Sequence, residues 1–146
     1  MSKKSIKVVT GVIGSDVHKV GNSIIETYLE QTENVEPVNI GVMASQKEFV
    51  DAAYEEGADA VWVSSLYGQG ELDCKGLKES FTEYGLDDVL LYIGGNLSIG
   101  KTDYDEVVET YSELGFDGVY PVNTPGTNPK ELPEKAYNDM LEDLGY

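Results

Sequence analysis

The 146-residue chain contains no arginine, one cysteine and one histidine, and its 10 basic residues, all lysines, stand against 27 acidic ones. Its formal net charge is -17. Proteins that bind nucleic acid rely on arginine forks and a positive surface, and a strongly negative chain would repel a phosphate backbone. We therefore exclude DNA and RNA as partners.

Cys74 is the only cysteine, so an intrachain disulfide or a thiolate cluster for zinc or iron-sulfur is impossible. A lone thiol suits a reducing cytosol. No apolar run approaches the roughly 18 residues of a membrane span. The basic N-terminus is followed by an apolar run ending by Ile13, without the small-residue cleavage site of a secreted protein. We expect a cytoplasmic protein with no membrane contact.

The acidic residues are dispersed over the predicted helices rather than collected in a tail. Dispersed charge of this size favours a protein adapted to concentrated salt, because screening by ions removes most of its self-repulsion. A halophilic source is the favoured interpretation, and an ordinary acidic mesophilic protein is the alternative. We expect salt to stabilise the fold.

Apolar strand-like runs alternate strictly with helical patterns. The predicted strands are 6–13, 36–40, 58–63, 89–93 and 118–120, and the predicted helices are 21–32, 45–56, 76–84, 104–114 and 129–144. Such alternation predicts an α/β fold with a parallel sheet buried on both faces. We expect one domain over residues 1–146, a doubly wound, flavodoxin-like (Rossmann-like) five-stranded sheet flanked by helices.

Single residues mark the predicted helix ends and core. Gly57 and Gly115 are expected helix C-caps, and Ser45 and either Thr102 or Asp103 are expected N-caps. Cys74 lies at a predicted helix start, where the dipole could lower its pKa, but a small structural residue is the favoured interpretation. Trp62 and the tyrosines are interpreted mainly as packing residues.

Three loops carry the candidate chemistry. Asp16 and His18 follow the first strand, Ser64 the third, and Gly94 the fourth, so all are expected at the carboxyl edge, where such sheets bind ligands. A carboxylate that can accept the second N–H of an imidazole is typical of a metal-ligating histidine. Taken singly, each residue also suits an ordinary loop or turn, and only the three-part pattern favours a site.

This pattern, Asp-x-His-x-x-Gly, then Ser-x-Leu, then Gly-Gly, resembles the cobalamin-binding domain of adenosylcobalamin-dependent mutases and methionine synthase. The longer stretches 11–16, 63–71, 73–77 and 91–96 resemble the small (sigma) subunits of glutamate mutase, also called methylaspartate mutase. The resemblance runs from about Lys7 to about Pro125. It implies that the single domain binds adenosylcobalamin.

The resemblance also implies the role of each residue. His18 would be the axial ligand of cobalt, replacing the dimethylbenzimidazole base of the cofactor, with Asp16 orienting it. Ser64 would hydrogen-bond the displaced base, Leu66 would contact it, and the Gly94–Gly95 pair would leave room for the nucleotide tail. The implied cofactor-binding residues are Ser15, Asp16, Val17, His18, Gly21, Ser64, Leu66, Tyr67, Gly68, Gly94, Gly95 and Asn96, and His18 is also the implied metal ligand.

The implied reaction is the adenosylcobalamin radical rearrangement that interconverts L-glutamate and (2S,3S)-3-methylaspartate. One domain is too short to add a catalytic barrel, so a larger, epsilon-type catalytic subunit would supply it, in a heterotetramer. That partner would hold most of the glutamate, because this chain has no arginine for a substrate carboxylate. The alternative is a corrinoid carrier for methyl transfer, which usually follows a helical cap module that we do not expect before Ile6. Flavodoxin and receiver-domain patterns are not found.

Overall fold

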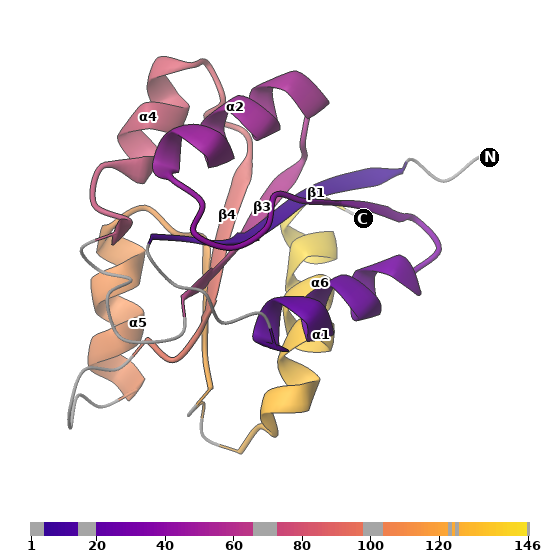
Figure 1. The fold of residues 1–146 in the computed structure, drawn as a ribbon. Helices are drawn as coiled ribbons and strands as arrows, with labels where there is room; N and C mark the ends of the chain where they lie inside the picture. The colour runs from indigo at the N-terminus through magenta and orange to yellow at the C-terminus, as the bar shows by residue number, and fades with distance from the viewer. Residues whose placement is uncertain are drawn as a thin grey trace.

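The computed structural model describes residues 5–14, 20–65, 73–97, 104–122, 124 and 126–145. Its centre is a five-stranded parallel sheet in the order β2-β1-β3-β4-β5 (Figure 1). The strands are β1 (Ile6–Val12), β2 (Val35–Asn39), β3 (Ala60–Ser65), β4 (Leu90–Gly95) and β5 (Gly118–Pro121). This is the strand order of flavodoxin-type doubly wound sheets, so the predicted fold is confirmed.

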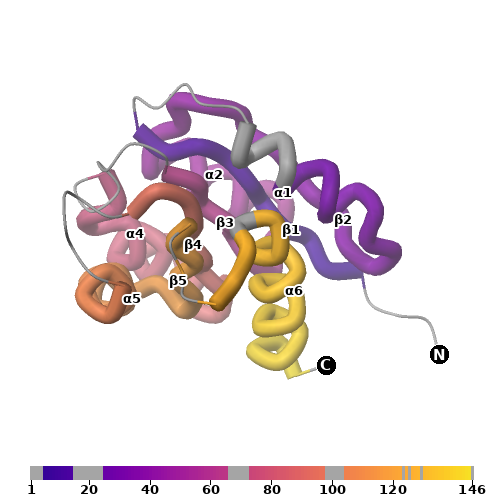
Figure 2. Tube along the Cα trace, turned by 90° about the horizontal axis from the view of Figure 1, so that it is seen from below, coloured from indigo at the N-terminus to yellow at the C-terminus, as the bar shows by residue number. Residues whose placement is uncertain are grey.

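Helices cover both faces of the sheet. They are α1 (Val20–Glu30), α2 (Gln46–Glu56), α4 (Leu77–Glu83), α5 (Tyr104–Glu113) and α6 (Leu132–Asp143), with a 3-10 turn, η1 (Pro129–Glu131), before α6. In Figures 1 and 2, helices α1 and α6 lie on one face, and α2, α4 and α5 lie on the other. The last helix was predicted as one element from Pro129, but the α-helix begins only at Leu132, since Pro133 is tolerated only in a first turn.

Strand alternation divides the core in two. Along β3, Trp62 contributes to the cluster under α1 and α6, while Val61 and Val63 contribute to the cluster under α2, α4 and α5. On β4, Tyr92 belongs to the cluster under α1 and α6, and Leu91 belongs to the cluster under α2, α4 and α5. A strand sends successive side chains to opposite faces, so the continuous apolar runs in the sequence serve both layers.

Two aspartates fix the amino edge of the sheet. Asp59 accepts a hydrogen bond from the backbone N–H of Lys7, and Asp117 accepts one from that of Leu91, each at 3.0 Å. The predicted C-cap at Gly57 is confirmed by its left-handed conformation, with φ 63°. These contacts lie at the edge opposite the candidate site, so they hold the scaffold rather than a ligand.

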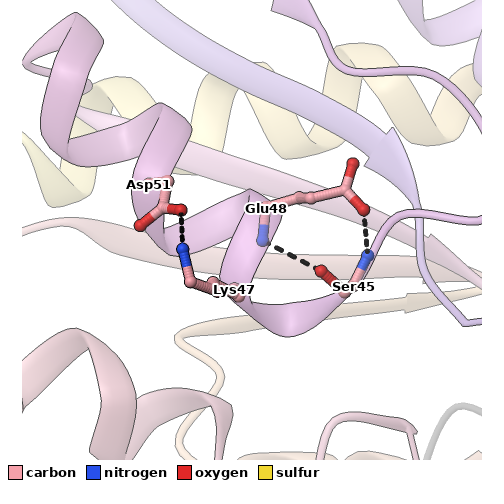
Figure 3. Close-up of polar contacts among 4 residues, drawn as sticks. All are labelled: Ser45, Lys47, Glu48 and Asp51. Atoms are coloured by element: carbon pink, nitrogen blue, oxygen red, sulfur yellow. Dashed lines mark hydrogen bonds and ion pairs between the residues drawn. The ribbon is translucent and has the colours of Figure 1, made fainter.

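The start of α2 is a complete capping box, as Figure 3 shows. The Ser45 hydroxyl accepts from the Glu48 backbone N–H at 3.1 Å, and the Glu48 carboxylate accepts from the Ser45 N–H at 3.3 Å. The predicted N-cap at Ser45 is thus confirmed, whereas Thr102 and Asp103 lie outside the described residues.

Replacing Ser45 by alanine is expected to lower the free energy of unfolding by about 1 kcal/mol, because an N–H in the first turn loses its acceptor. Urea unfolding followed by circular dichroism measures this. Lys47→Ala in the same turn is the matched control, since it removes only the exposed ion pair with Asp51 and should cost clearly less than the loss of the cap. Equal losses in the two variants would contradict a role for the cap.

Among the described helices, none is both long and apolar enough to pass through a bilayer.

Candidate functional site

The carboxyl ends of four strands form one row across the sheet. Ser64 is in register with Val12 on one side and with Gly94 on the other, and Gly94 is in register with Tyr120. The strand order reverses between β1 and β3, which is where ligands bind in this class of fold. The predicted meeting of the β1, β3 and β4 strand ends at one edge is confirmed.

A pocket of about 170 Å³ lies on the α1 and α6 side of this row. Its wall is predominantly apolar, and it is built from β3, β4, β5 and the two helices. The lining residues are Ile25, Trp62, Val63, Ser64, Tyr92, Ile93, Gly94, Gly95, Tyr120, Val122, Lys130, Leu132, Pro133 and Ala136. Since apolar cavities of about 150 Å³ bind benzene, the pocket is large enough for a planar aromatic ring.

Two buried polar groups in the pocket wall have no partner in the described structure. They are the Ser64 hydroxyl oxygen and the Trp62 indole nitrogen, on residues that are 2% and 3% exposed. Alternation along β3 turns both side chains toward the α1 and α6 face, where the pocket lies. Leaving a buried hydroxyl or N–H unpaired costs about 1–3 kcal/mol. The wall is therefore suited to a ligand that is apolar except for one or two polar atoms.

Two of the aromatic residues that line the pocket are hydrogen-bonded to α6. Tyr92 stacks beside Trp62 and lies against Tyr120, with ring centroids 6.2 and 5.4 Å apart. Their hydroxyls donate to carboxylates of α6, Tyr92 to Asp143 and Tyr120 to Asp139. Burial, followed by these hydrogen bonds, raises the pKa of both phenols. Both therefore stay protonated and act as donors that hold α6 against the sheet.

Gly94 suits the close packing of β4 and β5. A β-carbon at this position would lie 3.2 Å from the carbonyl oxygen of Tyr120, closer than ordinary contacts. Gly95 follows with φ 116°, a conformation that side chains disfavour. Asn96 comes next and is exposed at the edge. Gly94 and Gly95 both line the pocket, and the predicted room for a nucleotide tail at this pair stays a prediction.

Several predicted residues lie outside the described part of the chain. They are Ser15, Asp16, Val17, His18, Leu66, Tyr67 and Gly68. Gly21 is described only as backbone, in the first turn of α1. Among the described residues, no group of three His, Cys, Asp or Glu side chains could hold a metal ion. The predicted cobalt contact by His18 therefore stays a prediction.

Gly14 is the last described residue before His18, and its position is fixed by its neighbours. Gly14, with φ 79°, hydrogen-bonds through its N–H to the carbonyl of Ala44, and the carboxylate of Asp73 fills the space that a β-carbon of Gly14 would need. The Gln46 side-chain amide donates to the Asp73 carbonyl at 2.7 Å. These contacts hold the chain in place just past the β1 end.

The pocket walls include residues to which sequence reasoning gave no ligand role. Trp62 and the tyrosines were interpreted as packing, and the α6 residues Leu132, Pro133 and Ala136 were only part of a helix. One signal was available, because Trp62 precedes Ser64 by two positions on a strand and must share its face.

Cys74 is a core residue, with 0% exposure, in the cluster under α2, α4 and α5. Burial, followed by the charge of Asp73, raises the pKa of the thiol to about 12. The interpretation as a small structural residue is confirmed, and a lowering of its pKa by the helix is excluded.

In the folded chain, Cys74 is expected to react with a disulfide reagent near pH 8 at least about 100-fold more slowly than in urea, since both access and thiolate are lacking. The neutral thiol also contributes stability that is fully present below its unfolded pKa of about 9 and is lost as the pH rises toward about 12. Thiol titration and unfolding curves at alkaline pH measure both effects. Rapid labelling of the folded chain would contradict the buried placement.

Comparisons with known proteins agree with this architecture. A model of the B12 binding domain matches residues 6–121. A glutamate mutase sigma subunit of Carboxydothermus hydrogenoformans is 54% identical over 142 residues, which cover 97% of this chain and 98% of that protein. The sigma subunit of Clostridium tetanomorphum is 49% identical over 146 residues, covering 99% and 98%.

Solved structures show the same fold at low identity. A cobalamin-binding protein from Desulfitobacterium hafniense superposes with a TM-score of 0.70 at 20% identity, covering 92% of this chain and 59% of that one. This likeness concerns the fold alone, whereas the near-complete matches at about half identity define the family. The chain belongs to the B12-binding domain family and, within it, to the glutamate mutase sigma subunits.

Proposed function

We propose that this chain is the adenosylcobalamin-binding small subunit of a glutamate mutase and that it acts with a larger catalytic subunit. Together they would interconvert L-glutamate and (2S,3S)-3-methylaspartate. The proposal is supported by the near-full-length similarity to sigma subunits. A heterotetrameric assembly, a cytoplasmic location and a halophilic source stay predictions.

The pocket beside Ser64 is the observation that carries the cofactor assignment. Dimethylbenzimidazole is flat and mainly apolar, and it has a ring nitrogen that accepts a hydrogen bond once it leaves cobalt. The pocket offers an apolar wall, a ring-sized volume and, as the donor, the Ser64 hydroxyl, which has no partner among the described residues. The described residues therefore fit the displaced base.

The axial ligand is assigned to His18, the only histidine of the chain. Asp16 would accept the second imidazole N–H and fix the ring orientation, as carboxylates do for metal-bound histidines. The stretch that contains His18 follows β1, whose last residue, Val12, is in register with Ser64. One protein chain would thus hold both the lower face of cobalt and the base that left it.

The cofactor, when bound, supplies the radical chemistry, and the protein supplies position and shelter. This chain would anchor the nucleotide tail in the pocket, orient the cofactor through His18 and exclude water from its lower face. The larger subunit would bind most of the glutamate, since no arginine is present here to pair with a carboxylate. The methyl-transfer alternative is less supported, because the near-complete relatives are sigma subunits.

Ser64→Ala tests the assignment, because it should preserve or raise the stability of the chain while it lowers the affinity for cobalamin. Removing an unpaired buried hydroxyl should leave the free chain as stable as before, or more stable by about 1 kcal/mol. The same change should raise the Kd for cobalamin by about 5- to 20-fold, because the base then lacks its donor. Urea unfolding and a cobalamin titration measure the two effects.

Ser65→Ala is the matched control, since Ser65 is equally buried on β3 but does not line the pocket. Its Kd for cobalamin should be unchanged. If Ser64→Ala bound cobalamin as tightly as the unchanged chain, the pocket would not hold the base.

A further inference from the structure

Among the described residues that line the pocket, one carries a charge, and it lies at the rim. Lys130 lines the pocket and is also exposed, so it lies where the pocket opens to solvent. Of the lining residues that the structure describes, no other is charged. The ion pairs that lysines form among the described residues involve Lys7, Lys47 and Lys135. The Lys130 ammonium therefore takes part in no ion pair within the described part of the chain.

The turn before α6 places Lys130 at this rim. Asn128 accepts the Lys130 backbone N–H through its side chain at 3.0 Å, and its carbonyl accepts the N–H of Glu131 at 2.8 Å. Leu132 and Pro133, which follow Glu131, already form the pocket wall. The backbone of Lys130 is thus fixed one step outside the apolar surface.

The polar groups in the pocket wall indicate which kind of ligand the pocket would bind. Ser64 and Trp62 each bring into the apolar wall a buried polar atom that has no partner in the described part of the chain. Together with Lys130, they describe a ligand with an aromatic ring inside and a negative charge at the entrance. A nucleotide has this form, because its base is linked through a ribose to a phosphate.

We propose that Lys130 binds the phosphodiester of the cobalamin nucleotide tail at the rim of the pocket whose interior holds the base. This assignment rests on the proposed function and adds to it a residue that selects corrinoids carrying a complete nucleotide. Lys130 is a positioning residue, because it contacts the tail and not the reacting atoms.

The positive charge of Lys130 would attract an anion to an otherwise strongly acidic chain. A protein of net charge -17 repels an anion, so a phosphate at its surface needs a local cation. An exposed pair of this kind contributes modestly and is screened by salt. Removing the charge should therefore weaken tail binding by about two- to fivefold at low ionic strength, with the difference lost in concentrated salt.

The test compares two corrinoids, cobalamin and cobinamide, the second of which lacks the whole nucleotide. The variants are Lys130→Gln, the charge-conserving Lys130→Arg and, as matched control, Lys47→Gln on the opposite helical layer. Binding is followed by the corrin absorption spectrum and by the fluorescence of Trp62, the only tryptophan, which lines the pocket. Lys130→Gln should raise the Kd for cobalamin but not for cobinamide, while Lys130→Arg and Lys47→Gln should change neither.

An unchanged cobalamin Kd in Lys130→Gln, or equal weakening for both corrinoids, would overturn the phosphate assignment while the proposed function stands. If the unchanged chain bound neither corrinoid, the proposed function would fail, and the role of Lys130 with it. The two failures are therefore distinguishable in one set of titrations.

Discussion

Gly94→Val is expected to raise the Kd for cobalamin by about 100-fold and to leave the sheet intact. The valine would begin 3.2 Å from the Tyr120 carbonyl and add its methyl groups at the pocket wall, where the base needs space. Burial of an aromatic group is worth about 1.5–3 kcal/mol, and losing it corresponds to roughly 10- to 150-fold in Kd. Titration with cobalamin measures the loss.

Stability must be measured beside binding, since overpacking costs about 1–3 kcal/mol of its own. Gly94→Ala should give an intermediate loss of affinity. Ala52→Val adds comparable volume on α2, a helix that covers the other face of the sheet, and should not change the Kd. If Gly94→Val folded and bound cobalamin normally, the tail would not occupy this pocket.

His18→Gly is expected to lower mutase activity by more than about 100-fold when the chain is combined with a glutamate mutase large subunit. Loss of a group that only supports a metal ligand costs about 10- to 100-fold, and here the ligand itself is removed. The conversion of glutamate to methylaspartate measures the effect. Asp16→Asn should cost less, because the imidazole would remain while losing its charged acceptor.

Imidazole added to the His18→Gly protein is the control for folding. Free imidazole should restore part of the activity if the variant has lost only its axial ligand. Near-normal turnover of His18→Gly without imidazole would contradict the assignment of the axial position.

The fold and the edge of the site were predictable because they depend on local patterns. Ser64 and Gly94 lie one residue before the ends of β3 and β4, and parallel strands bring their carboxyl ends to one edge whatever the details of packing. The capping box at Ser45 and the turn at Gly57 likewise follow from neighbouring residues. Such features need no knowledge of contacts between distant segments.

The pocket was not predictable in the same way. Its second wall comes from α6, and which face of that helix meets Trp62 and Tyr120 depends on the packing of distant elements. Lys130 lies at the rim because it belongs to η1, which comes directly before α6. The pKa of Cys74 also depended on burial, which outweighs its place before a helix.

The central claim is that His18 is bound to cobalt while the base of the cofactor has left it. The electron paramagnetic resonance spectrum of cob(II)alamin bound to the protein tests this directly, with ordinary or 15N-labelled histidine. Because the chain has one histidine, any labelled nitrogen on cobalt must be His18. We predict that the superhyperfine triplets change to doublets on labelling. Triplets in both samples would mean that another nitrogen occupies the axial position, and they would contradict the account.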